Sequence, residues 1–283
     1  MIRSQVVSKK RLDHYLAEQY ADISRAFLQK LCNTEQVLVN GKPEKSGYKL
    51  KLTDKVTVLY DMAGIEKIAD IDLPVIYQDD DILVISKPAG VISHARGKYW
   101  NEPSVASFIR QTTNQTGDRV GIVHRLDRAT SGVMICAKTQ DAMVFLQTQF
   151  AERKVKKIYQ AVVVGHIEPK QAIIDMPIER NPKAPSTFRV GPNGKVAQTA
   201  YKVTDSSENY DLIQLEPKTG RTHQLRVHMA NQGHPIVGDT LYNGEPAERL
   251  LLHAGELTIE LPSGKLMTFS VPIPSEFEEY LKK

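Results

Sequence analysis

The sequence predicts an α+β protein: a mixed, largely antiparallel β-sheet domain preceded by a small α+β domain. Two observations favour this class. Apolar runs of strand length are grouped along the chain with only three or four helical patterns among them, rather than alternating with helices. The charge is also uneven, because residues 1–62 hold 11 Lys and Arg against 7 Asp and Glu, whereas residues 63–283 hold 26 of each. We therefore predict a small basic domain at 1–62, a linker at 63–73 and a larger domain at 74–283.

The composition is that of an ordinary soluble globular protein. Of its 283 residues, 41% are apolar and 25% are charged. No apolar run approaches the ~18 residues of a membrane span, and the N-terminus lacks the apolar core of a secretory signal. Cys32 and Cys136 lie in apolar contexts and are expected to be reduced, buried thiols. We expect a cytoplasmic monomer that binds no membrane, and the sequence identifies no protein partner.

The small domain is expected to contain two helices, a hairpin and a closing strand. Residues 10–20 have helical periodicity, and Ser24 is a candidate cap for a second helix. The apolar stripe of that second helix consists of Phe27, Leu28, Leu31 and Cys32. A strand at 37–39 followed by an Asn-Gly pair predicts a hairpin, and residues 56–60 form the next strand.

The larger domain is expected to be rich in strands. Its predicted strands are residues 82–85, 133–137, 158–164, 198–204, 210–216, 250–253, 257–261 and 266–269. Helices are predicted within 100–117, from Thr139 to Phe150, and after residue 221 as far as Gly233. A polar, proline-containing region separates the strand at 158–164 from the next one.

The densest polar stretch, residues 124–132, reads HRLDRATSG and precedes an apolar run. Asp127 lies there between Arg125 and Arg128, and a Thr-Ser-Gly bend leads into the strand expected at 133–137. Loops at strand ends often carry reactive groups. A carboxylate next to guanidinium groups stays ionised, so it is available as a nucleophile or a base rather than as an acid. By spacing alone, a helix cap or a surface ion pair explains Asp127 equally well.

Other reactive residue types do not form a known catalytic or metal-binding pattern. A serine hydrolase would use Ser131, His124 and Asp127, but the Gly-x-Ser-x-Gly signature is absent. Four histidines lie late in the chain, at positions 223, 228, 234 and 253, without an acidic residue or a cysteine at metal-ligand spacing. Glycine-rich phosphate loops are missing as well. We therefore predict no metal and no organic cofactor.

The stretch at 124–132 resembles the signature His-Arg-Leu-Asp-x-x-Thr-Ser-Gly of the RluA family of pseudouridine synthases. Further stretches match motifs of this family in the same order: residues 82–90, 157–159, 219–228, 233–239 and 251–254. The resemblance covers roughly residues 74–274 and implies the pseudouridine synthase fold. One departure lies at Ser93-His94-Ala95, where the family commonly has His-Pro.

The resemblance implies roles for individual residues of the larger domain. Asp127 is expected to be the nucleophile, Arg226 to pair with it, and Tyr159 to stack on the target base. Arg125 is expected to enter the RNA in place of the flipped base, and Leu225 to line the pocket. The neighbouring side chains expected to contact the substrate are His124, Arg128 and Lys157.

The small domain resembles the RNA-binding domain named after ribosomal small-subunit protein four. The matching residues are 11–13, 24–25 and 37–41, whereas residues 33–35 and 53–54 depart from its pattern. The resemblance implies contacts with RNA phosphates, which position RNA without reading its sequence. The basic side chains expected to make these contacts are Lys9, Lys10, Arg11, Arg25 and Lys30. On charge alone, a solvated basic surface without a partner is the alternative.

The reaction of this family converts a uridine in RNA to pseudouridine. Uracil is detached from its ribose, turned and rejoined through carbon, which requires a carboxylate and a base flipped out of the RNA stack. RNA is the expected partner. The resemblance of the front domain implies large-subunit ribosomal RNA as the substrate, with transfer RNA as the alternative.

Two other functions remain compatible with the sequence. An RNA-binding or ribosome-assembly protein would bind a base without turning it over. A hydrolase built on Ser131 would lose its activity in Ser131→Ala and tolerate Arg226→Ala, and the family resemblance predicts the reverse order.

Overall fold

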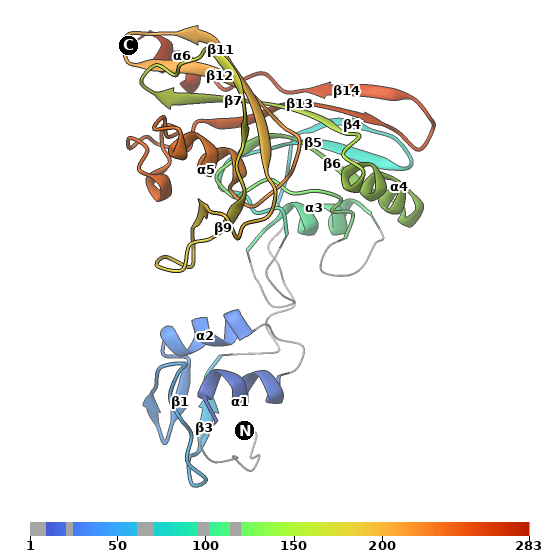
Figure 1. The fold of residues 1–283 in the computed structure, drawn as a ribbon. Coiled ribbons are helices and arrows are strands. Elements are labelled where there is room, and N and C mark those ends of the chain that lie inside the picture. The colour runs from blue at the N-terminus through green and yellow to red at the C-terminus, as the bar shows by residue number, and fades with distance from the viewer. Residues whose placement is uncertain (1–9, 21–24, 61–70, 95–101, 114–119, 283) are drawn as a thin grey trace.

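The computed structural model describes residues 10–20, 25–60, 71–94, 102–113 and 120–282 (Figure 1). Lys9, Ser24 and most of the linker predicted at 63–73 lie outside these ranges. Within them, no helix has both the length and the apolar character needed to cross a membrane.

The small N-terminal unit has the predicted order of helix, helix, hairpin and strand. Its elements are α1 (Leu12–Gln19), α2 (Arg25–Asn33), β1 (Val37–Val39), β2 (Lys42–Pro43) and β3 (Val56–Val58). The strands form an antiparallel sheet in the order β2-β1-β3. Buried apolar residues between Leu12 and Leu50 form a cluster separate from those of the large sheet. This separate core supports the predicted division of the chain, whose boundaries at 62 and 74 stay predictions.

A buried ion-pair network joins the two helices of this unit. The fully buried Asp13 carboxylate accepts hydrogen bonds from three side chains, Arg11 (Nε–Oδ1 3.0 Å), Arg25 (Nη2–Oδ2 2.9 Å) and Gln29 (Nε2–Oδ2 2.7 Å). Burial raises the pKa of Asp13, but these hydrogen bonds outweigh burial and hold the pKa well below its usual range. Arg11 and Arg25, which were predicted as phosphate contacts, therefore also have an internal partner.

Nine strands of the described residues form one sheet, in the order β4-β5-β6-β13-β7-β12-β11-β8 with β14 beside β13. The bounds are β4 (Val75–Gln78), β5 (Ile82–Lys87), β6 (Ser131–Ala137), β7 (Lys156–Val164), β8 (Gln171–Asp175), β11 (Gln198–Ser206), β12 (Tyr210–Pro217), β13 (Leu252–Glu260) and β14 (Leu266–Ser270). A separate ribbon consists of β9 (Ile178–Arg180) and β10 (Phe188–Val190). Only the β6–β13 pair of the large sheet is parallel, which confirms the predicted mixed, largely antiparallel sheet.

Helices cover both faces of this sheet (Figure 1). They are α3 (Val105–Thr112), α4 (Gln140–Ala151), α5 (Gln224–Asn231) and α6 (Glu276–Leu281), with a short 3-10 helix, η2 (Thr240–Tyr242). Successive residues of β7 point to opposite faces, since Ala161 packs in a cluster with Met229 of α5, whereas Val162 packs with Phe277 of α6. By the same alternation, Tyr159 lies on the face covered by α5.

The structure differs from the sequence analysis at several elements. The strands predicted at 250–253 and 257–261 are one strand, β13, because Gly255 lies at a bulge in the sheet instead of turning the chain. Strands β4, β8 and β10 were not predicted, because their residues are largely exposed or part-exposed and lack apolar alternation. The helix α6 has only six residues, too few for a periodic signal.

Candidate active site

The loop that carries Asp127 is fixed by the turn that follows β5. The Ser93 hydroxyl brackets Leu126, because it donates to the Leu126 carbonyl oxygen (2.8 Å) and accepts from the Leu126 N–H (3.1 Å). On the other side of the carboxylate, the Gly90 N–H donates to the Arg128 carbonyl oxygen (2.8 Å). The backbone of Asp127 is thus held on both sides, as a reactive group with a fixed orientation requires.

Lys87 reinforces this arrangement from inside the core. Its side chain is fully buried, and its ammonium group donates to three backbone carbonyl oxygens, those of Pro88 (2.8 Å), Val91 (2.7 Å) and Arg128 (3.3 Å). Burial lowers the pKa of Lys87 to about 7, although the charge of Asp127 opposes this shift. Lys87 lies in the stretch 82–90 that resembles the family, but nothing in the sequence predicts its burial, since lysine is rarely buried.

Gly132 lets β6 pass close to β13 just after the Asp127 loop. Its φ is +119°, and a Cβ on this residue would lie 2.1 Å from the Ala254 carbonyl oxygen. The two strands pair in parallel through Ser131 with His253 and Gly132 with Ala254. Neither backbone can withdraw without breaking this pairing, so the position requires glycine.

We expect Gly132→Ala to lower the free energy of unfolding by about 3 kcal/mol or more, because backbone strain and a backbone clash add. The matched control is Gly264→Ala, between β13 and β14, where φ is +80° and no atom lies within 4 Å of an added Cβ. That variant should lose only about 1 kcal/mol. Urea unfolding of both variants gives the comparison, and equal losses would contradict the close-approach argument.

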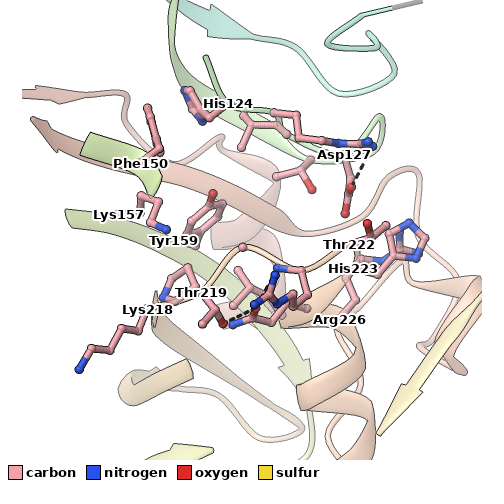
Figure 2. Close-up of a pocket in the computed structure, with 18 of the residues that line it drawn as sticks. His124, Asp127, Phe150, Lys157, Tyr159, Lys218, Thr219, Thr222, His223 and Arg226 are labelled. Atoms are coloured by element: carbon pink, nitrogen blue, oxygen red, sulfur yellow. Dashed lines mark hydrogen bonds and ion pairs between the residues drawn. The ribbon is translucent and has the colours of Figure 1, made fainter. Parts of the chain in front are cut away.

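A pocket of about 440 Å³ opens beside Asp127 (Figure 2). Four segments line it: the Asp127 loop, the end of α4 with the start of β7, the connection from β12 into α5, and the start of β13 through Leu252. The predicted site residues among the lining residues are His124, Arg125, Asp127, Lys157, Tyr159, Leu225 and Arg226. Segments far apart in the sequence therefore meet at one site.

Asp127 is paired only loosely. Its side chain is 19% exposed, and Arg125 Nη2 lies 3.7 Å from its Oδ1. The Arg125 side chain is 53% exposed, and an ion pair in contact with solvent contributes little free energy. Arg125 can therefore separate from Asp127 at a small cost in free energy.

Arg226 pairs with Asp239 and not with Asp127, which corrects the sequence analysis. Its Nε and Nη2 donate to the two carboxylate oxygens of Asp239, at 2.7 and 2.6 Å, and both side chains are buried. A buried carboxylate needs such a bidentate partner, whereas Asp127 reaches the open pocket. Burial lowers the pKa of Arg226, but Asp239 and Asp127 outweigh burial, so the pKa is raised. Asp127 thus still acts on Arg226 electrostatically.

Asp239 and Tyr242 are site residues that the sequence analysis missed. Asp239 lies within the matched stretch 233–239, but nothing in the pattern identifies its partner. The Tyr242 ring lies against the Arg226 guanidinium, 5.0 Å from ring centroid to guanidinium carbon, and its hydroxyl is 2.8 Å from His223 Nδ1. These two residues orient the pocket wall formed by Arg226 and His223.

Tyr159 enters the pocket from β7, with Lys157 beside it (Figure 2). Burial and the charge of Asp127 raise the pKa of Tyr159, so the phenol is protonated at neutral pH. Its ring packs against the apolar cluster that contains Leu225. The tyrosine therefore offers a flat surface for a base and a hydroxyl that donates a hydrogen bond.

Comparison with known proteins adds to this geometry. The model of a family described as RNA pseudouridylate synthase matches residues 81–231, which contain Asp127, Tyr159 and Arg226. The chain belongs to this family. The model of the S4 domain matches residues 10–56. The protein is therefore an RNA pseudouridine synthase with an N-terminal S4 domain, as the sequence predicted.

Relatives of the synthase match it over nearly its whole length. Ribosomal large subunit pseudouridine synthase C of Vibrio parahaemolyticus is 33% identical over 96% of this chain and 92% of that protein. Ribosomal large subunit pseudouridine synthase D of Escherichia coli is 35% identical over 96% of this chain and 90% of that protein. The solved structure of human RNA Pseudouridylate Synthase Domain Containing 1 has a TM-score of 0.62 and 28% identity, covering 74% of this chain and 86% of that chain.

Two predicted substrate contacts of the synthase also have structural partners. Arg128 lies outside the residues that line the pocket, and its guanidinium pairs with Glu102 (Nη2–Oε2 2.8 Å), so its contact with the substrate stays a prediction. His124 does line the pocket, but its Nε2 accepts the Ile135 N–H (3.1 Å) and its ring stacks on Phe150, with centroids 4.5 Å apart. Burial lowers the pKa of His124 to about 3, so the neutral ring forms part of the pocket wall.

The structure does not arrange Ser131, His124 and Asp127 as a serine hydrolase requires. Ser131 is buried, and its hydroxyl contacts His253 Nδ1 (2.8 Å) and the Arg249 guanidinium. Because His124 is engaged elsewhere, the three residues of a Ser131–His124–Asp127 set do not meet. Among the described residues, no three or more His, Cys, Asp or Glu side chains cluster as a metal site.

The basic side chains predicted to contact RNA in the S4 domain stay predictions. Lys9 lies outside the described residues, and Lys30 lies in the last turn of α2. The others have ion-pair partners within the domain, Lys10 with Glu18 and both Arg11 and Arg25 with Asp13. The side chains of these three are 30–47% exposed, so part of each remains open to a phosphate.

Proposed function

We propose that this synthase converts specific uridines of large-subunit ribosomal RNA to pseudouridine, with Asp127 as the nucleophile. The observation that carries the proposal is the position of Asp127, a carboxylate on a rigid loop at the same pocket as Tyr159 and Arg226. Relatives named for the large ribosomal subunit resemble this chain over both of its parts, which supports the choice of RNA. Transfer RNA is the alternative substrate.

The reaction is an isomerisation, so every atom of the uridine is retained. The bond from base N1 to ribose C1′ breaks, a bond from C5 to C1′ forms, C5 loses a proton and N1 gains one. Asp127 would form a temporary bond to C1′ or to C6 of the base, and both suit a carboxylate nucleophile. Because nothing is oxidised or reduced overall, the chemistry requires no redox partner.

The other pocket residues would hold the flipped nucleotide. Tyr159 and Leu225 provide the apolar and aromatic surface on which uracil rests, and the phenol donates a hydrogen bond to it. Taking the base out of the stack costs roughly a few kcal/mol. Arg125, which is loosely held in the free protein, would offset this cost by filling the vacated position in the RNA.

The S4 domain would anchor the RNA through its phosphates, with Lys9, Lys10, Arg11, Arg25 and Lys30 as the candidate contacts. We further propose that the protein works as a monomer. We also propose that the protein acts in the cytoplasm, where ribosomal RNA and transfer RNA are its possible substrates.

The test is pseudouridine mapping on ribosomal and transfer RNA from cells that lack this protein. The same strain is complemented with the wild type or with Asp127→Ala. We expect specific large-subunit sites to vanish and only the wild type to restore them. Sites lost from transfer RNA would reassign the substrate. Restoration by Asp127→Ala, or no lost site at all, would favour an RNA-binding or assembly factor.

A further inference from the structure

The pocket extends beyond the surroundings of Asp127. We propose that three of its lining residues, Arg153, Lys157 and Lys218, bind a phosphodiester group of the RNA strand next to the flipped nucleotide. These three residues are called the cationic end below. The inference rests on the proposed function, because it assumes that RNA occupies the pocket.

The charge of the pocket lining supports this inference. Six lining residues are Lys or Arg, namely Arg125, Arg153, Lys157, Lys218, Arg221 and Arg226, and one, Asp127, is acidic. Arg125 pairs with Asp127, Arg226 pairs with Asp239, and the Arg221 side chain donates to a backbone carbonyl oxygen. Within the described part of the chain, the side chains of the cationic end have neither a carboxylate partner nor a hydrogen bond.

Lys157 is the residue of this group that most needs an anion. It lies two residues before Tyr159 on β7, so both side chains point to the same face of the sheet. Burial alone lowers the pKa of Lys157, because no charged neighbour compensates for the lost water. A phosphodiester carries a permanent negative charge. When bound beside Lys157, it would offset the free-energy cost of burying the ammonium group.

The position of the cationic end favours a neighbouring phosphate over the target base. Figure 2 shows Lys157 and Lys218 on the side of Tyr159 away from Asp127. A neutral uracil carbonyl needs a single donor, whereas three cations without a carboxylate partner suit an anion. A pocket of about 440 Å³ also has room for more than one uracil ring.

The first test is steady-state kinetics on a short RNA that contains the modified uridine. We expect Lys157→Gln to raise KM roughly tenfold and to change kcat less than threefold, since the contact holds the strand and not the reacting atoms. The dependence of log(kcat/KM) on log salt concentration should also become less steep, by roughly 0.7 to 0.9. Lys218 is exposed, so Lys218→Ala carries little risk to folding. This variant should also make the dependence of log(kcat/KM) on log salt concentration less steep.

Lys156→Gln is the matched control. Lys156 is the neighbouring residue of β7, exposed on the opposite face of the strand, and it does not line the pocket. This variant should behave as the wild type in KM, kcat and salt dependence. An equal effect of Lys156→Gln and Lys157→Gln would mean that general charge attraction, not a phosphate site, accounts for the result.

A second test locates the phosphate without relying on turnover. RNAs with one neutral methylphosphonate at each position around the target uridine are titrated with Asp127→Ala and with Asp127→Ala combined with Lys157→Gln. We expect one position at which the methylphosphonate weakens binding to the first protein and not to the second. If the losses of binding caused by the methylphosphonate and by Lys157→Gln add at every position, the inference is overturned. A fall in kcat alone for Lys157→Gln would also overturn it, and would indicate that Lys157 contacts the target base. If the wild type forms pseudouridine under these conditions, such a result leaves the proposed function intact.

Discussion

Asp127→Asn is expected to abolish pseudouridine formation while RNA binding and the fold persist. The amide has the size of the carboxylate but is a far weaker nucleophile, so the loss should be on the order of 10³-fold or more, which is ~4 kcal/mol in the barrier. The loop should not move, because it is held through the backbone of Leu126 and Arg128 rather than through the Asp127 side chain. Loss of the C5 proton from radiolabelled uridine in RNA measures the reaction.

The matched control for this prediction is Asp141→Asn, an exposed aspartate in the first turn of α4, which should retain full activity. In a serine hydrolase built on Ser131, Ser131→Ala would abolish the activity. In this synthase, Ser131→Ala should lower the stability, because Ser131 is buried against His253 and Arg249, but should leave pseudouridine formation in place. Substantial pseudouridine formation by Asp127→Asn would show that another group attacks the nucleotide.

The sequence identified the members of the site well but not their pairing. Motif order brought Asp127, Tyr159, Leu225 and Arg226 together before any geometry was available, because each lies in a stretch that resembles the family. Pairing is a tertiary property. Arg226 takes the carboxylate of Asp239, 13 residues further along the chain, and no periodicity links the two. Which of two carboxylates holds a guanidinium depends on how the segment after α5 folds back.

Residues that support the site were harder to predict than residues that line it. Lys87 and Ser93 fix the Asp127 loop through backbone carbonyl and N–H groups, contacts that leave no pattern in side-chain type. Ser93 even belongs to a departure from the family motif, and the structure gives that departure a role. Lysine is seldom fully buried, so its burial cannot be inferred from residue type alone.

Charge summed along the sequence hid a local feature. Residues 63–283 have equal numbers of acidic and basic side chains, so the summed charge indicated a basic domain only within the first 62 residues. Folding gathers basic side chains from the end of α4, the start of β7 and the end of β12 around one pocket. The acidic residues that balance them lie elsewhere, and only the fold separates the two groups in space.

Asp239→Asn is expected to lower kcat roughly 10- to 100-fold although Asp239 does not line the pocket. Without the second carboxylate, the buried guanidinium of Arg226 has Asp127 as its remaining acidic neighbour and should turn towards it. A direct guanidinium contact would make Asp127 a weaker nucleophile and would favour its ionised form. The free energy of unfolding should fall as well, by about 3 kcal/mol, because a buried ion pair loses one partner.

The pH dependence separates this positioning role of Asp239 from a simple loss of stability. If Arg226 turns to Asp127, the acid side of the profile of kcat/KM against pH moves to lower pH, since the carboxylate then resists protonation. A variant that is only less stable would lose activity without that displacement. Glu179→Gln is the control, because it breaks the more exposed Arg189–Glu179 pair (Nη2–Oε1 2.7 Å) away from the pocket and should leave the profile unchanged. An unshifted acid limb in Asp239→Asn would mean that Arg226 keeps its place without Asp239, and that Asp127 works independently of the pair.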